Sequence, residues 1–87
     1  MIDNHLRLFF WDVNVETFDP HAYPEYTIFR LLELGDEKAV AWLRAEFSQR
    51  QIEKVVRTER RLSPRSANFW ALVYRIPAKE VAALTPQ

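Results

Sequence analysis

The strongest chemical signal in this sequence is a group of four arginines beside a helix start. Ser63 followed by Pro64 is typical of an N-cap residue and the first residue of a helix. The arginines around this start are Arg57, Arg60, Arg61 and Arg65. Guanidinium groups near the amides of a helix N-terminus would bind an anion, either a nucleic-acid phosphate or acidic side chains of a protein partner. Alternatively, the arginines pair with acids of the same molecule.

The same stretch has the outline of a helix-turn-helix, in which the helix that begins at Ser63 and Pro64 would read DNA. Arg65, Ser66 and Asn68 would then lie at the start of the recognition helix. Bulky apolar residues follow on nearly all sides of this helix, namely Phe69, Trp70, Leu72, Val73 and Tyr74. A recognition helix needs a free polar face for base edges. A DNA-binding transcriptional repressor is therefore the alternative prediction, after protein binding.

Catalytic and metal-binding groups are scarce. His5 and His21 are far apart and lack the spacing or the additional ligands of a metal site. Asp12 and Asp19 with His21 could form an acid–base group, but no further residue is placed to orient them. We expect both aspartates to form caps and turns instead. With one glycine and no cysteine, the chain also lacks a glycine-rich phosphate loop and a thiolate metal site, so we predict no enzymatic activity, no metal and no cofactor.

The charged residues are sorted along the chain. Residues 1–37 carry eight acids and two bases, whereas residues 38–87 carry ten bases and four acids, which gives formal charges of −6 and +6. Such sorting predicts one negative and one positive face, an arrangement that suits docking to a partner. The sequence has no apolar run long enough to span a bilayer, and its start does not resemble a signal peptide. We therefore expect a cytoplasmic protein without membrane contact.

Helix start and stop signals divide most of the chain into short helices. The first helix is expected to begin near Pro24 and to end at Gly35, where a left-handed residue would terminate it. The second begins with Asp36 as its N-cap, and the third begins with a capping box formed by Ser48 and Gln51. A fourth helix from Ser63-Pro64 to Pro77 and a short fifth helix over about 78–84 complete the series.

The start of the chain is different, because bulky and β-branched residues from Leu6 to Val15 suit an extended segment or a packed arm. The chain therefore predicts an all-α fold, a compact bundle of four to five short helices with an N-terminal extended arm. Residues 1–23 would form the aromatic arm and residues 24–87 the helical domain of a single folding unit.

Three tryptophans could stack on a ligand, but in a domain this small we expect Trp11, Trp42 and Trp70 to supply core area. An aromatic residue left exposed beside an arginine would instead be an interface anchor, because tryptophan, tyrosine and arginine dominate binding hot spots. Trp11, in the arm, is the candidate for that role.

Three stretches resemble an uncharacterised family of small bacterial and archaeal proteins. They are Phe10-Trp11-Asp12-Val13, the Leu32 to Trp42 segment, and Arg61-Leu62-Ser63-Pro64-Arg65-Ser66-Ala67-Asn68-Phe69-Trp70-Ala71-Leu72. The hallmarks of that family are a Phe-Trp-Asp start and a Leu-Ser-Pro-x-x-Ala-Asn-Phe-Trp helix. Its members are often encoded beside a nucleotidyltransferase-like toxin of the abortive-infection type. The resemblance therefore implies an antitoxin or accessory partner of a toxin–antitoxin pair.

Taken together, these patterns predict a small protein-interaction domain. The candidate partner-binding residues are Trp11, Arg57, Arg60, Arg61, Arg65 and Asn68. The expected partner is a protein, and the resemblance suggests a nucleotidyltransferase-like toxin. Promoter DNA is the alternative partner, and a homodimer formed by exchange of the apolar arm is a third arrangement.

Overall fold

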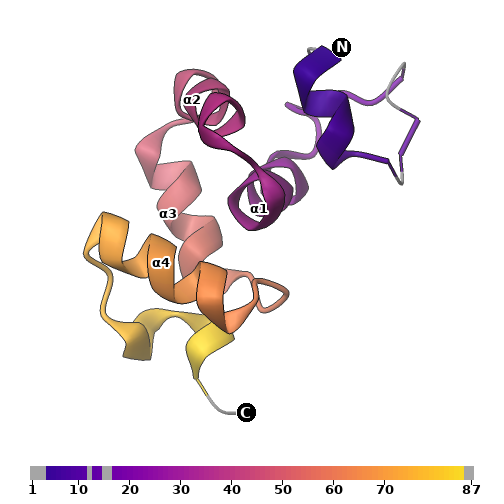
Figure 1. Ribbon diagram of the computed structural model, residues 1–87. Helices are drawn as coiled ribbons and strands as arrows, with labels where there is room; N and C mark the ends of the chain where they lie inside the picture. Colours follow the sequence, from indigo (N-terminus) through magenta and orange to yellow (C-terminus); the bar gives the residue numbers. More distant parts are fainter. Residues whose placement is uncertain (1–3, 12, 15–16, 86–87) are drawn as a thin grey trace.

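The computed structural model describes residues 4–11, 13–14 and 17–85. Its elements, in chain order, are η1 (Asn4–Phe9), α1 (Pro24–Leu34), α2 (Glu37–Glu46), α3 (Gln49–Thr58), α4 (Pro64–Tyr74), η2 (Ala78–Glu80) and η3 (Ala82–Leu84). The four α-helices follow one another through short turns, and the three 3-10 helices lie at the two ends of the chain (Figure 1). The described part of the chain contains no β-strand. The predicted all-α bundle of short helices is therefore confirmed.

The predicted start signals of three helices are confirmed by their cap hydrogen bonds. The carboxylate of Asp36 accepts from the N–H of Ala39 at the start of α2. Ser48 and Gln51 form the expected reciprocal capping box at the start of α3. The Ser63 hydroxyl accepts from the N–H of Ser66 and Pro64 takes the first position of α4, as expected. Each cap pairs backbone amides that the first turn of a helix would otherwise leave without a partner.

Gly35 ends α1, but the reason differs from the predicted left-handed cap. Its φ of −71° and ψ of 153° are extended backbone that any residue can adopt. Glycine is needed here because a Cβ atom would lie 2.5 Å from the carbonyl oxygen of Leu31 and 3.2 Å from the Cβ of Ala39. Glycine is therefore required because the chain passes close to the last turn of α1 and to Ala39 of α2, and not because of a left-handed backbone.

Among the described residues, Arg75 is the one with a left-handed backbone, and it ends α4 with φ of 56° and ψ of 43°. Beyond it, the predicted fifth helix is replaced by two single-turn 3-10 helices, η2 and η3. Val81, between them, is completely buried, and η3 contacts both α3 and α4. One apolar side chain thus anchors the end of the chain without a continuous helix.

The N-terminal arm is not extended over residues 4–9, because these residues form η1. Leu6 and Phe10 are 1% and 0% exposed, and Phe10 lies against the rings of Phe18 and Tyr26 at centroid distances of 5.2 and 6.1 Å. The apolar residues of the arm therefore fill the core of their own molecule.

α1 lies at the centre of the fold and contacts α2, α3, α4 and η1. Its buried face includes Ile28 and Leu31, which join Leu43 of α2 and Val55 and Val56 of α3 in the core. The indole N–H of one further core residue, Trp70, donates to the carbonyl of Leu32 over 2.9 Å. This bond fixes α4 against the end of α1. Among the described residues, no helix combines the length and the apolar character needed to cross a membrane.

Candidate functional site

Trp11 is not in the core, which corrects the expectation for this residue. Its side chain is 69% exposed, whereas Trp70 is buried and Trp42 is half-buried. The guanidinium carbon of Arg30 lies 4.3 Å from the centroid of the Trp11 ring and 5.6 Å from that of Tyr26. The Nε of Arg30 donates to the carbonyl of Phe9 over 2.7 Å, so the arginine is fixed from two sides. The result is the arrangement expected of an interface anchor, an exposed tryptophan beside an arginine.

The exposure of Trp11 follows from the position of its neighbour. Phe10 occupies a completely buried site, and the N–H of Val13 donates to the carbonyl of Phe10 in a turn that begins there. Two consecutive bulky rings in such a turn cannot both point into a core of this size. Phe10 takes the core position, and the indole lies on the surface over α1.

Arg61 extends this surface through its contact with Phe29 of α1. Its Nε and Nη2 each donate to one carboxylate oxygen of Glu59 over 2.9 Å, and its guanidinium lies 4.5 Å from the ring centroid of Phe29. The hydrogen bonds from Arg61 lower the pKa of Glu59, and the same bonds raise the pKa of Arg61. We call Trp11, Tyr26, Phe29, Arg30 and Arg61 the Trp11 surface.

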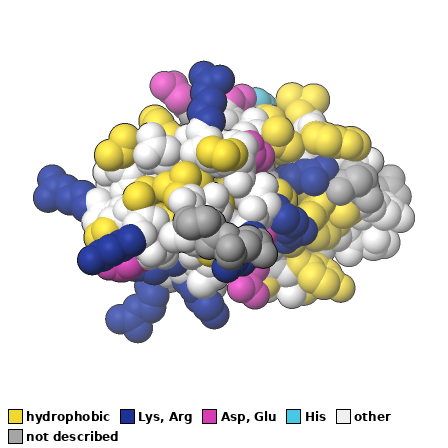
Figure 2. Space-filling view, turned by 90° about the horizontal axis from the view of Figure 1, so that it is seen from below, with side chains coloured by type: hydrophobic (Ala, Val, Ile, Leu, Met, Phe, Trp, Pro, Cys, Tyr) yellow, Lys and Arg dark blue, Asp and Glu magenta, His cyan; other side chains and the backbone are white. Residues whose placement is uncertain are grey.

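Basic and exposed hydrophobic side chains lie directly against each other on the side of the molecule where the N-terminal segment lies (Figures 1 and 2). Sequence reasoning identified Trp11 and Arg61 but not Tyr26, Phe29 and Arg30. The available signal was the spacing of Tyr26 and Arg30, which places both side chains on one face of α1.

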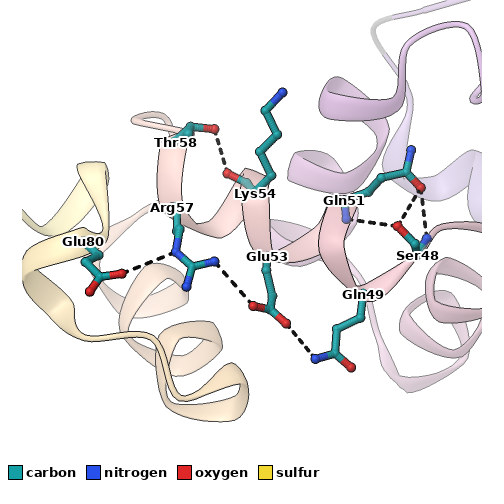
Figure 3. A network of polar contacts seen from close by, with 8 residues as sticks. All are labelled: Ser48, Gln49, Gln51, Glu53, Lys54, Arg57, Thr58 and Glu80. Carbon is teal, nitrogen blue, oxygen red and sulfur yellow. Dashed lines mark hydrogen bonds and ion pairs between the residues drawn. The ribbon is translucent and has the colours of Figure 1, made fainter.

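Arg57 and Arg60 point to a different part of the molecule. Arg57 lies 3.4 Å from Glu53 of the same helix and 3.6 Å from Glu80 of η2 (Figure 3). Arg60 donates over 3.5 Å to the carbonyl of Ala82 in η3. These two arginines therefore connect α3 to the end of the chain. The structure does not bring them together with Arg61 in one basic patch, and their ion pairs are with acids of the basic half rather than the acidic half.

The predicted anion site at the start of α4 is already filled. The carboxylate of Glu33, on α1, accepts from the N–H of Ser63 over 2.8 Å and from the hydroxyl of Ser66 over 3.1 Å. Glu33 thus occupies the position in which an external phosphate or carboxylate would bind. This geometry weighs against DNA recognition through the N-terminus of α4.

Arg65 and Asn68 are exposed on α4, beside the exposed side chains of Phe69 and Leu72. All four line a shallow hollow of about 590 Å³ between α4 and the end of α1. The large apolar side chains on this face would exclude the water and polar contacts through which a helix reads base edges. The face is better suited to a protein surface.

The two histidines bind carboxylates and join the N-terminal segment to both ends of α2. The Nε2 of His5 lies 2.9 Å from Asp36, and that of His21 lies 2.9 Å from Glu46. Asp19 accepts from the N–H of His21, as expected of a turn residue. The hydrogen bond from His5 and that from the N–H of Ala39 lower the pKa of Asp36.

The described residues contain no group of three or more side chains that could hold a metal ion. Asp12, the other aspartate considered for acid–base chemistry, lies outside the described residues. Each of the described histidines and aspartates forms a cap, a turn or a surface ion pair.

Comparison with known families gives one match. A family model with the description "Family of unknown function (DUF6922)" matches residues 6–56. No curated protein and no solved structure matches the chain significantly. The matched residues include the Trp11 motif and the Leu32 to Trp42 segment, whereas the Arg61 to Leu72 stretch lies beyond them. The expectation of an uncharacterised family is confirmed.

Proposed function

We propose that this chain, which belongs to the family of unknown function DUF6922, is a protein-interaction domain that binds its partner through the Trp11 surface. The observation that carries the proposal is that the indole of Trp11 is 69% exposed while the guanidinium of Arg30 holds it at 4.3 Å. An exposed tryptophan is common, but one that is ordered by a fixed arginine is already in a conformation that a partner can bind.

Three physical features support binding at this surface. An aromatic side chain such as that of Trp11 can bury about 150–250 Å² in an interface. Because Arg30 and Arg61 are held by the carbonyl of Phe9 and the carboxylate of Glu59, binding would order few additional side chains. Tryptophan, tyrosine and arginine, the residue types that dominate interface hot spots, occur together here.

For the partner, we propose a nucleotidyltransferase-like toxin, with this chain as its antitoxin or accessory protein. The support for this class is the resemblance of the Phe10 to Val13, Leu32 to Trp42 and Arg61 to Leu72 stretches to small bacterial and archaeal proteins that are often encoded beside such toxins. We also propose a cytoplasmic location for the complex. The acidic and basic halves of the chain could each complement a charged surface of the partner.

The test is affinity purification of the full chain, tagged at its C-terminus, from the cells that encode it, with identification of bound proteins by mass spectrometry. We expect stoichiometric recovery of a nucleotidyltransferase-like protein, and loss of that protein when Trp11→Ala is the bait. Recovery of the bait alone, or of promoter DNA in place of a protein, would overturn the proposal.

Charge-reversal variants test whether recovery of the partner depends on the Trp11 surface. Arg61→Glu should reduce recovery of the partner because it removes a guanidinium from the Trp11 surface. Arg50→Glu is the matched control, since Arg50 is an exposed residue of α3 whose side chain has no hydrogen bond or ion pair with any described residue. Equal losses for both variants would indicate a general charge effect and contradict a specific role for Arg61.

A further inference from the structure

α4 exposes large apolar side chains on the face that points away from the core. Phe69, Leu72 and Val73 are 55%, 71% and 41% exposed. Their spacing along the helix places them in one stripe, while the opposite face of α4 buries Ala67, Trp70 and Ala71. A helix that is apolar on both faces is typical of an element that lies between a core and a bound partner.

The surface around the stripe is hollowed on both sides. Phe69 lines the hollow of about 590 Å³ beside the end of α1 and a second hollow of about 350 Å³ beside α2. Val73 lines a third hollow, next to Arg44 and Arg75. The apolar side chains therefore form a ridge between grooves, a shape that can interlock with the side chains of a second helix.

The charges at the ends of α4 restrict what can bind there. Arg65 lies in the first turn and Arg75 is the C-cap, so about 15 Å of helix separates them at 1.5 Å per residue. The helix between them carries no acidic residue. Neither arginine forms a hydrogen bond or ion pair through its side chain with any residue that the structure describes. The apolar stripe therefore lies between two arginines that make no direct ion pair with a described residue, and the acids Glu33, Asp36 and Glu37 line the hollows beside Phe69.

This charge pattern disfavours pairing of α4 with α4 of a second copy of the chain. In an antiparallel pair of α4 helices, Arg65 of each copy would face Arg75 of the other, and in a parallel pair each arginine would face its own copy. Either arrangement places like charges opposite each other at both ends of the contact. A complementary occupant needs acids in those positions.

We propose that the α4 face, formed by Arg65, Phe69, Leu72, Val73 and Arg75, binds an amphipathic helix of another protein. The apolar stripe of that helix lies between two acidic residues spaced about ten positions apart, which matches the separation of the two arginines. The inference rests on the proposed function only in that the occupant is a polypeptide. It names a second contact surface, separate from the Trp11 surface.

The probe is a synthetic helical peptide of about four turns that carries a leucine stripe between two glutamates about ten residues apart. The matched probe has lysines in place of the two glutamates. Binding of each fluorescently labelled peptide to the full chain is followed by anisotropy. We expect the glutamate peptide to bind about tenfold more tightly than the lysine peptide, because two exposed ion pairs replace two repulsive contacts.

Variants assign the binding to the face. Leu72→Gln should abolish binding of the glutamate peptide, while Leu8→Gln should not, because Leu8 is similarly exposed but lies on η1, across α1 from α4 (Figure 1). The double variant Arg65→Gln/Arg75→Asn should bind the two peptides with equal affinity. Asparagine is chosen because it tolerates the left-handed backbone at position 75.

The outcomes separate this inference from the proposed function. Equal affinity of the wild-type chain for the two peptides, unchanged binding by Leu72→Gln, or no binding would overturn it. So would a dimer in sedimentation experiments that Leu72→Gln dissociates, because the occupant would then be a second copy. The Trp11→Ala variant should bind the peptide with the affinity of the wild type. Failure of the proposal for the α4 face can therefore be distinguished from failure of the proposal for the Trp11 surface.

Discussion

The carboxylate of Glu33 accepts a hydrogen bond from the backbone N–H of Ser63 over 2.8 Å. Its other oxygen accepts from the hydroxyl of Ser66 over 3.1 Å. Glu33, an acid of the negatively charged half of the chain, thus caps the first turn of α4, the helix that follows the arginine-rich segment. Because this internal carboxylate neutralises the start of α4, the arginines nearby are not needed to hold an anion there.

Replacing Glu33 should therefore destabilise the fold. Glu33→Ala removes the acceptor for a partly buried backbone N–H and for a hydroxyl, and we expect the free energy of unfolding to fall by about 1–3 kcal/mol. Glu33→Gln should lower the free energy of unfolding by less, because its amide oxygen can still accept one of the two hydrogen bonds. Urea denaturation of both variants provides the measurement. Glu25→Ala, an exposed acid in the first turn of α1, is the control, and an equal loss there would contradict the specific role of Glu33.

Gly35→Ala tests the explanation given for the end of α1. At an ordinary extended backbone, an alanine would stabilise the protein by about 0.4–1 kcal/mol through the unfolded state. Here the added Cβ would lie 2.5 Å from a backbone oxygen, so we expect a loss of about 1–3 kcal/mol instead. Whether Gly35→Ala raises or lowers the Tm distinguishes the gain from the loss. A raised Tm would show that a Cβ at position 35 fits beside the carbonyl of Leu31, and it would contradict the explanation.

Much of the fold could be predicted from local signals. The caps at Asp36, Ser48 and Ser63 depend on residues three positions apart, and a single sequence contains that information. The role of Gly35 depends on how closely the folded chain passes Leu31 and Ala39, and η1 depends on the packing of Leu6 and Phe10 against distant residues. Neither tertiary effect is visible in local patterns.

The candidate site was only partly predictable for the same reason. The arginines near Ser63 look like one group in the sequence, but Arg57 contacts Glu80 of η2 and Arg61 contacts Phe29 of α1. The exposure of Trp11 depends on Phe10 taking the core position and on Arg30, far along the chain, covering one face of the indole. The composition indicated which residue types could form an interface. Which of these residues lie together on the surface depends on the fold.

The pair formed by His5 and Asp36 should make stability depend on pH in the acid range. The hydrogen bond from His5 lowers the pKa of Asp36 in the folded state below its unfolded value of about 3.9. The stability that the His5–Asp36 hydrogen bond gives the folded state is therefore fully present above the unfolded pKa of Asp36. It is lost as the pH falls through the lower pKa of Asp36 in the folded state. We expect His5→Ala to lower the Tm at about pH 6, with a difference from wild type that disappears near pH 2.

Asp36→Asn provides the control for this prediction, because asparagine is an equally good N-cap but cannot titrate. In that background, His5→Ala should change the Tm by the same amount at both pH values. A pH-dependent difference that persists without the Asp36 carboxylate would show that another group is responsible.

The most direct test of the account is the dissociation constant of the purified complex between this chain and its captured partner, measured for wild type and Trp11→Ala. Because the indole is exposed, the substitution should leave the Tm nearly unchanged. We predict that the dissociation constant rises by about tenfold or more, as for an interface hot spot. An unchanged dissociation constant for the folded variant would contradict the claim that the Trp11 surface is where the partner binds.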